Sequence, residues 1–215
     1  MALPPHSELI QLLPAALVGS LPGIAAHRTM APYPARIKPG MISVEGKDAR
    51  EAATLVLIYP HQGAEESALV LTARQPALRD HSGQISLPGG SRDGDETAEE
   101  TALREGWEEV GLAPEEPRVL GRLSPIHIPP SGFSVVPVVA SVDYAPPFQI
   151  QEAEVAALLE VPLSHLLDPE TRQMSSRRTE AGVFEAPYFA VDGHEVWGAT
   201  AMMLAEFVAV LETLN

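Results

Sequence analysis

Three glutamates in the stretch from Gly90 to Leu112 constrain this chain more than any other feature of its sequence. Glu105, Glu108 and Glu109 are spaced i, i+3 and i+4, so a helix places their carboxylates on one face. Like charges this close destabilise a plain helix, and their convergence therefore suggests that something cationic sits there. Oxygen ligands without His or Cys favour a hard ion, Mg²⁺ or Mn²⁺.

The flanking residues predict a turn followed by this helix. The run Pro88-Gly89-Gly90 is a turn signal at the end of a short apolar strand. Asp95 or Thr97 can cap a helix that runs to about Val110, and Gly111 is a typical helix stop.

Two further groups can act on the carboxylates. Arg104 lies four residues before Glu108, within reach to orient that carboxylate. Gly89 and Gly90 permit a tight turn whose backbone carbonyl could point at the same ions. An isolated E-x-x-E-E motif is more often a solvated acidic helix face, so the complete spacing has to decide between the two interpretations.

The complete spacing resembles the Nudix box. It runs G-x5-E-x7-R-E-x2-E-E-x-G followed by an aliphatic residue, from Gly90 to Leu112. Seven fixed residue types at roughly 7% each match by chance on the order of 10⁻⁸ per start position. One departure is Gly106, where the family usually has an aliphatic residue; it costs up to about 1 kcal/mol of helix propensity but allows close packing on a sheet.

The Nudix resemblance implies a fold and a reaction. The fold is a Nudix-type α/β/α sandwich with a mixed β-sheet, and the reaction is hydrolysis of a diphosphate that joins a nucleoside to another group. Two or three divalent ions are expected. By position, Glu105, Glu108 and Glu109 are the implied metal ligands, with Glu105 also orienting the attacking water, and Glu96 ties the loop to the helix through Arg104.

The general base is less clearly indicated, since the family recruits it from different loops. Glu154 opens the segment EVAALLEVPL and resembles the late glutamate that serves some members as a ligand or base. Glu152 is the competing candidate. The ordinary alternative for both is an exposed acidic residue at the start of a strand.

The stretch from Leu71 to Gly90 is similar to the signature of the coenzyme A diphosphatase subfamily, L-L-T-x-R, a spacer and G-x-x-x-F-P-G-G. Leu87 replaces the usual Phe, and Gln75 replaces Ser or Ala. The segments EVAALLEVPL and APYFAVDGHEVWGATA are similar to the same subfamily, so the resemblance covers most of residues 50–212.

This resemblance implies that the substrate is coenzyme A (CoA) or an acyl-CoA. The products are 4′-phosphopantetheine, or its acyl form, and adenosine 3′,5′-bisphosphate. Arg74, Arg79 and His81 would offer cationic donors to the additional 3′-phosphate, which an Arg fork suits. The alternatives are a surface ion pair for Arg74 and a loop hydrogen bond for His81. Phe133 and Tyr144 could stack on adenine, although core packing is their commoner use.

Two other functions stay open. One is hydrolysis of another nucleoside diphosphate, such as ADP-ribose, NADH or a dinucleoside polyphosphate. The other is a Nudix-fold module that senses a nucleotide without turnover, which has no need of three intact glutamates.

Composition limits the partners. The net charge of −15 argues against a sequence-independent grip on nucleic acid. There is no cysteine, which excludes disulfides and thiolate sites. The N-terminus lacks a basic region, and its apolar stretch is broken by Gln11, Pro14 and Pro22, so neither a secretory signal nor a membrane span is expected. We therefore expect a cytoplasmic enzyme with a small-molecule nucleotide substrate and, as one option for the N-terminal residues, a homodimer.

The chain divides into an extension at residues 1–45 and a Nudix domain at residues 46–215. The extension should hold a helix near Ser7 to Val18 and Pro-broken loops. The domain should hold a hairpin of two apolar strands and further strands on both sides of the motif, with a closing helix at residues 200–214. The expected strands are 52–59, 68–74, 84–87, 119–123, 133–142, 188–190 and 195–197, and residues 154–167 mix strand and helix signals.

Overall fold

Strand β1 (Arg50–Pro60) lies at the centre of the main sheet, and apolar side chains cover both of its faces. The computed structural model describes residues 3–32, 49–61, 66–76, 84–128, 131–179 and 182–214. Leu55 and Leu57 point into one hydrophobic core, and Val56 and Ile58 point into a second core on the opposite face. A strand buried on both faces needs helices on each side.

The sheet around β1 is mixed. Strand β7 (Phe133–Ser141) runs parallel to β1 along its whole length. The opposite edge of β1 is shared by β2 (Ser67–Arg74) and β4 (Gly89–Ser91), both antiparallel to it. The remaining strands of this eight-stranded sheet are β3 (Ile85–Ser86), β5 (Arg118–Arg122), β6 (Ile126–Ile128) and β8 (Val155–Pro162).

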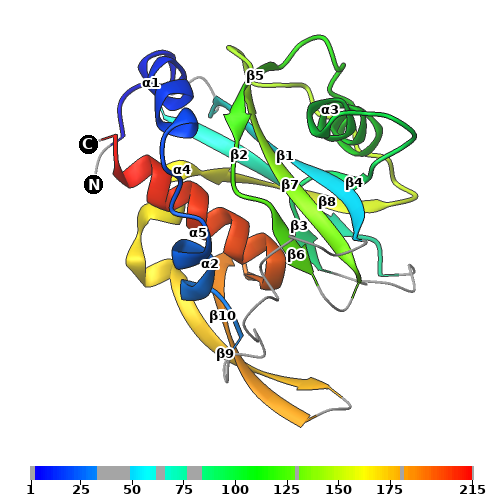
Figure 1. Cartoon of the computed structure of the whole chain (residues 1–215), viewed down its shortest axis with the longest axis vertical. Coiled ribbons are helices and arrows are strands. Elements are labelled where there is room, and N and C mark those ends of the chain that lie inside the picture. Colours follow the sequence, from blue (N-terminus) through cyan, green and yellow to red (C-terminus); the bar gives the residue numbers. More distant parts are fainter. Residues whose placement is uncertain are drawn as a thin grey trace.

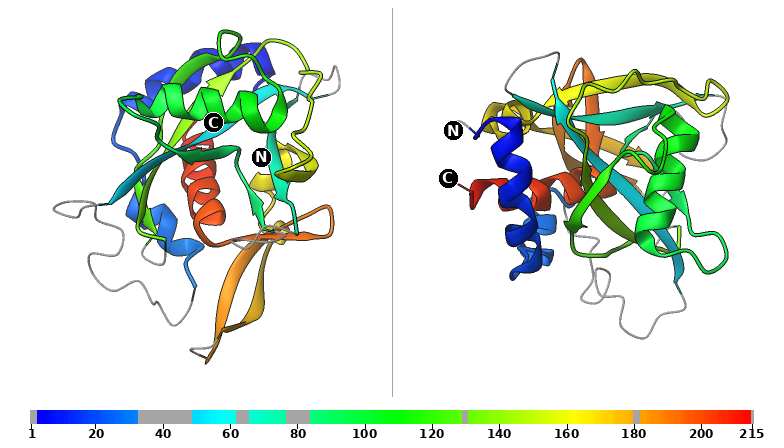
Figure 2. Two further views of the ribbon diagram at one scale, coloured as in Figure 1. Left: turned by 90° about the vertical axis from the view of Figure 1, so that its right-hand side faces the viewer. Right: turned by 90° about the horizontal axis from the view of Figure 1, so that it is seen from above.

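Helices cover the two faces of this sheet, as the resemblance predicted (Figures 1 and 2). Helix α3 (Ala98–Val110) lies on one face, and α1 (His6–Val18) and α5 (Gly198–Glu212) lie on the other. A Cβ on Gly106 would stand 2.7 Å from Leu55 Cδ2, so the glycine does let α3 pack closely on β1. The predicted α/β/α sandwich is confirmed.

A second, three-stranded sheet extends from the body beside α5 (Figure 1). It consists of β9 (Arg172–Thr179), β10 (Gly182–Val191) and β11 (His194–Trp197), joined by antiparallel pairing. The short helices α4 (Leu163–Leu167) and η1 (Pro169–Thr171) connect β8 to it. Asp192 and Gly193 both have positive φ and form the tight hairpin turn between β10 and β11, where strands were expected at 188–190 and 195–197.

Several elements differ from the expectations. A helix, α2 (Ile24–Thr29), stands where Pro-broken loops were expected, because Pro22 lies just before it rather than inside it. Ile126 to Ile128 form β6, although no strand was expected between 119–123 and 133–142. Strand β9 was not expected, since its Arg and Ser residues show no apolar alternation.

The described part of the N-terminal extension belongs to the main core. Leu9, Leu13 and Leu17 of α1 are buried in the same hydrophobic cluster as α5. The boundary expected at residue 45 lies outside the described residues. Within the described ranges, no helix is both long and apolar enough to cross a bilayer.

A buried side-chain hydrogen bond joins α2 to α5. His27 and Glu206 are each fully buried, and His27 Nε2 lies 2.9 Å from Glu206 Oε2. The backbone N–H groups of Gly23 and Ser124 also donate to the Glu206 carboxylate, at 2.9 and 3.0 Å. Burial opposes ionisation of Glu206, but these donors outweigh it and keep its pKa below the ordinary value.

We expect Glu206→Gln to lower the free energy of unfolding by about 3 kcal/mol at pH 7, because an amide nitrogen then faces buried donors. Urea unfolding of this variant and of Glu212→Gln, an exposed neighbour on α5, measures the effect. Since the folded pKa of Glu206 lies below its ordinary 4.5, the contribution is complete above that pH and is lost as the pH falls below it. A difference from the unsubstituted protein that is no smaller at acidic pH would contradict this account.

Candidate active site

The ends of α3 are set by local residues, and these determine where its side chains point. Thr97, rather than Asp95, is the N-cap, and its side chain accepts a hydrogen bond from the Glu100 backbone. The Glu100 carboxylate accepts in return from the Thr97 backbone, completing a capping box. Gly111 ends the helix with a left-handed φ of 76°.

Arg104 connects the helix to the loop before it. Its guanidinium donates to both oxygens of Glu96, at 2.8 and 3.1 Å, and to the Ser91 carbonyl at 2.9 Å. The hydrogen bond with Arg104 is the main reason that the pKa of Glu96 falls to about 2. The same guanidinium reaches Glu105 at 2.8 Å and Glu108 at 3.4 Å, so it neutralises part of the charge on both.

Glu109 is the most deeply buried of the three glutamates, with 5% of its surface exposed. Thr72 Oγ1 donates to its Oε2 at 3.2 Å, and the Gly89 backbone also forms a hydrogen bond with the carboxylate. Burial, followed by the charge of Glu105, raises the pKa of Glu109 to about 7. A nearby positive charge would therefore stabilise its ionised form.

The Glu105 side chain reaches from α3 to Gly90 of strand β4, where the sequence had indicated a turn. A Cβ on Gly90 would stand 2.5 Å from Glu105 Oε1, so a side chain at position 90 would displace the carboxylate from this place. Burial raises the pKa of Glu105; the contact with Arg104 opposes this, and the charges of Glu108 and Glu154 add to it. Two neighbouring carboxylates with raised pKa values form a site that favours a cation.

The backbone of Gly89 faces these carboxylates. The β1–β4 register pairs Gly89 with Thr54, while the adjacent Leu55 N–H donates to the Pro88 carbonyl. Hydrogen-bonded pairs alternate along antiparallel strands, so both polar groups of Gly89 point away from β1. Its N–H bonds Glu109, and in an extended strand the carbonyl of a residue points to the same side of the strand as its N–H.

These donors fit a hard divalent cation in type, since they are carboxylates and a backbone carbonyl. Within the ranges that the structure describes, however, no three Asp, Glu or His side chains converge closely enough to hold an ion together. The Glu108 side chain is half exposed, and Arg104 contacts oxygens of both Glu105 and Glu108.

The other predicted residues lie at different places. Arg74 ends β2 on the same face as Thr72, and its charge acts on Glu109. No hydrogen-bond acceptor among the described residues reaches its buried Nε. Arg79 and His81 lie outside the described residues.

Glu154 is exposed just before β8, and its charge acts on Glu105. Its backbone carbonyl accepts from the Gln75 N–H at 2.8 Å, which anchors the start of β8 beside the end of β2. Glu152 is also exposed, and its carbonyl accepts from the Gln75 side chain at 2.8 Å. Glu154, one of the two candidates for the general base, lies near enough for its charge to act on Glu105. No such interaction with Glu105 is seen for Glu152 in the described residues.

Sequence reasoning did not single out Thr72, although a signal for it was present. Val70, Thr72 and Arg74 alternate along β2 and share the face under α3. A polar residue at an inward position of an apolar strand needs a hydrogen-bond partner, and here that partner is Glu109.

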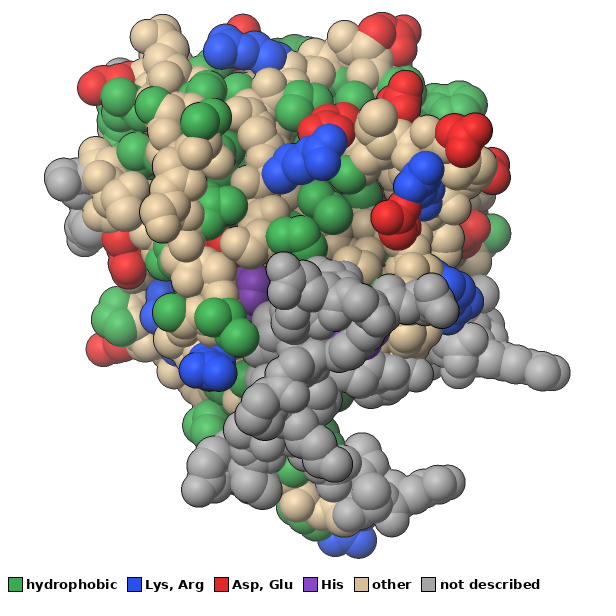
Figure 3. All heavy atoms as spheres, viewed as in Figure 1, with side chains coloured by type: hydrophobic (Ala, Val, Ile, Leu, Met, Phe, Trp, Pro, Cys, Tyr) green, Lys and Arg blue, Asp and Glu red, His purple; other side chains and the backbone are tan. Residues whose placement is uncertain are grey.

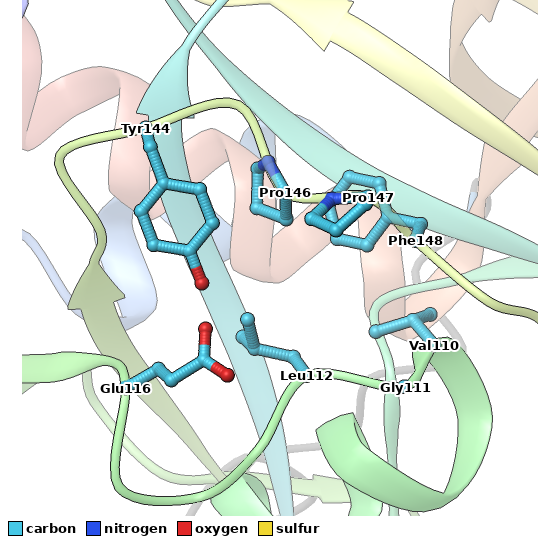
Figure 4. Close-up of a pocket in the computed structure, with 8 residues that line it drawn as sticks. All are labelled: Val110, Gly111, Leu112, Glu116, Tyr144, Pro146, Pro147 and Phe148. Carbon is cyan, nitrogen blue, oxygen red and sulfur yellow. The ribbon is translucent and has the colours of Figure 1, made fainter.

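A separate shallow pocket of about 140 Å³ lies at the C-terminal end of α3 (Figure 4). The hydroxyl end of Tyr144 points toward Glu116, and Pro146 and Phe148 form part of the apolar wall. Glu105, Glu108 and Glu109 do not line this pocket. Phe133 is the other aromatic residue that was considered for stacking on adenine. Its ring instead packs against the Arg50 guanidinium, whose central carbon lies 4.1 Å from the centre of the ring.

Acidic and basic side chains alternate over the surface around α3 in the space-filling view (Figure 3, upper right). Arg122 forms an exposed ion pair with Glu99 of α3, and Arg92 forms another with Glu51. Such exposed pairs contribute at most about 1 kcal/mol each to the stability of the fold. Their main effect is to place positive charges between the acidic side chains on this surface.

Comparison with solved structures shows the same fold. A Nudix hydrolase from M. smegmatis, RenU, aligns with a TM-score of 0.55 and 22% identity, covering 78% of this chain and 88% of that one. A C. elegans Ap4A hydrolase in a binary complex aligns with a TM-score of 0.50 and 17% identity, covering 76% and 98%.

Sequence comparison identifies nearer relatives. A protein of Pectobacterium atrosepticum called uncharacterized Nudix hydrolase NudL is 40% identical over 164 residues, covering 72% of this chain and 79% of its own. A protein of the same name from Yersinia pestis is 36% identical, covering 72% and 76%. The model of the NUDIX domain matches residues 49–180. The chain therefore belongs to the Nudix hydrolase family.

Proposed function

We propose that this protein hydrolyses the diphosphate bridge of CoA or of its thioesters. The products would be 4′-phosphopantetheine, or its acyl form, and adenosine 3′,5′-bisphosphate. The observation that carries the hydrolytic assignment is a pair of neighbouring carboxylates, the buried Glu109 and the partly buried Glu105, beside the polar backbone of Gly89. The similarity of residues 71–90 to the CoA diphosphatase signature supports the choice of substrate.

Members of this family typically use divalent metal ions. Glu105, Glu108 and Glu109, together with the Gly89 carbonyl, would hold Mg²⁺ or Mn²⁺ in this protein. Such ions neutralise phosphate oxygens, stabilise the leaving group and lower the pKa of water. Two or three ions would also offset the acidity of the chain for an anionic substrate.

The protein's own groups have separate tasks in this proposal. Arg104 holds the Glu105 and Glu108 carboxylates in place. Arg74, with no acceptor for its Nε among the described residues, would donate to a phosphate of the substrate. The Glu154 carboxylate would accept the proton that the attacking water loses as its oxygen bonds to phosphorus.

The main competing function is hydrolysis of another nucleoside diphosphate, such as ADP-ribose, NADH or a dinucleoside polyphosphate. Family membership is equally compatible with that choice. A nucleotide sensor without turnover is less well supported, because all three glutamates are retained on one helix.

We expect the protein to turn over CoA faster than ADP-ribose, NADH or a dinucleoside tetraphosphate in Mg²⁺ or Mn²⁺, with products resolved by chromatography. Glu109→Gln should remove the activity, while Glu116→Gln, a carboxylate in the pocket beyond α3, should retain it. CoA hydrolysis no faster than that of ADP-ribose would exclude the CoA assignment, and no turnover at all would favour the sensor.

We expect Glu154→Gln to lower kcat by roughly a hundredfold with the fold intact, because the amide cannot accept the proton from water. Glu152→Gln is the matched control, since both residues are exposed in the same short segment. Steady-state rates and thermal unfolding of both variants make the comparison. Near-normal activity of Glu154→Gln would remove Glu154 from the mechanism.

A further inference from the structure

We propose that Thr72 is a positioning residue for the cation site, in which its hydroxyl holds Glu109 Oε2 and leaves Oε1 for the ion. The inference rests on the proposed metal-dependent hydrolysis, but not on the choice of CoA as substrate. It assigns a role to a residue of β2 that lies 37 positions before its partner in the sequence.

The geometry places Thr72 in a short polar chain between two strands and α3. Its Oγ1 lies 3.2 Å from Glu109 Oε2, 3.3 Å from Ser86 Oγ and 3.4 Å from the Ser86 carbonyl. Ser86 is the cross-strand partner of Thr72 in the β2–β3 pairing. Thr72 is 2% exposed and Glu109 5% exposed, so water has little access to the contact between them.

The chemistry of the hydroxyl group sets the direction of this chain. A threonine hydroxyl has one proton to donate and can accept from another group. An ionised carboxylate only accepts, and Glu109 Oε2 at 3.2 Å is nearer and more strongly charged than the Ser86 carbonyl at 3.4 Å, so Thr72 donates to Glu109. Ser86 Oγ can donate to Thr72 in turn. A donor bound to Oε2 restrains rotation of the carboxylate.

The strand geometry limits the partners of the Thr72 hydroxyl to Glu109 and Ser86. Its backbone is paired with β8 on one edge and with β3 on the other. Threonine is also stiff at χ1, so the hydroxyl stays aimed at α3. Without it, the Gly89 backbone is the remaining hydrogen-bond donor found for this carboxylate in the described residues.

The test measures Mn²⁺ binding directly, by the loss of the free-ion electron paramagnetic resonance signal on titration. We expect Thr72→Val to weaken Mn²⁺ binding by roughly tenfold or more, as substitutions of residues that orient metal ligands do. Thr72→Ser should restore most of the affinity because it retains the hydroxyl. Ser86→Ala should have a smaller effect than Thr72→Val, since the Thr72–Glu109 hydrogen bond remains.

Thr171→Val serves as the control for loss of a buried hydroxyl. Thr171 is 7% exposed and donates to the carbonyls of His165 and Asp168, in a turn that carries none of the glutamates. The Thr171→Val substitution should lower the thermal unfolding temperature without changing the affinity for Mn²⁺. In active variants, Thr72→Val should lower kcat more than it raises the KM for substrate.

Equal Mn²⁺ affinity in Thr72→Val and the unsubstituted protein would overturn the inference, as would a Thr72→Ser variant that binds as weakly as Thr72→Val. Absence of saturable Mn²⁺ binding by the unsubstituted protein would overturn both this inference and the metal-dependent mechanism. Saturable Mn²⁺ binding without CoA hydrolysis would overturn the substrate assignment alone.

Discussion

Burial of the Glu109 carboxylate is the constraint on which the arrangement of this site depends. Removing a carboxylate from water is costly unless donors or cations replace the lost solvation. Here the donors come from Thr72 on β2 and the backbone of Gly89 on β4. Strands β2 and β4 therefore both have to lie close to α3. The contact between Gly106 and Leu55 of the neighbouring strand β1 shows how closely the helix packs on the sheet.

Positive charge around the helix then determines what an acidic chain can bind. Arg104 is shared among Glu96, Glu105 and Glu108, which leaves Glu109 without a direct ion pair among the described residues. Arg74 supplies a more distant charge on the same side. This distribution favours an added cation beside Glu105 and Glu109, and such a cation reconciles a net charge of −15 with an anionic phosphate substrate.

The parts of the fold that were predicted correctly are those with local causes. The cap at Thr97, one of the two candidates, the stop at Gly111 and the hairpin of β1 with β2 depend on residues close together in the sequence. Strands β4 and β9 were not expected, because short or Ser- and Arg-rich segments become strands only when a neighbour supplies hydrogen bonds. Helix α2 has only six residues, too few to show a helical period of apolar positions in the sequence. It is held against α5 by the hydrogen bonds of Gly23 and His27 with Glu206.

By itself, the sequence determined that Glu105, Glu108 and Glu109 share one helix face, because the spacing of a helix is a local property. It also identified the family, since the complete spacing in residues 90–112 is so improbable by chance. Only the tertiary structure decided that Glu109 is buried while Glu108 is half exposed, and that Thr72 is a partner of Glu109. Burial depends on which strands lie beneath each turn of the helix, and that packing joins residues distant in the chain.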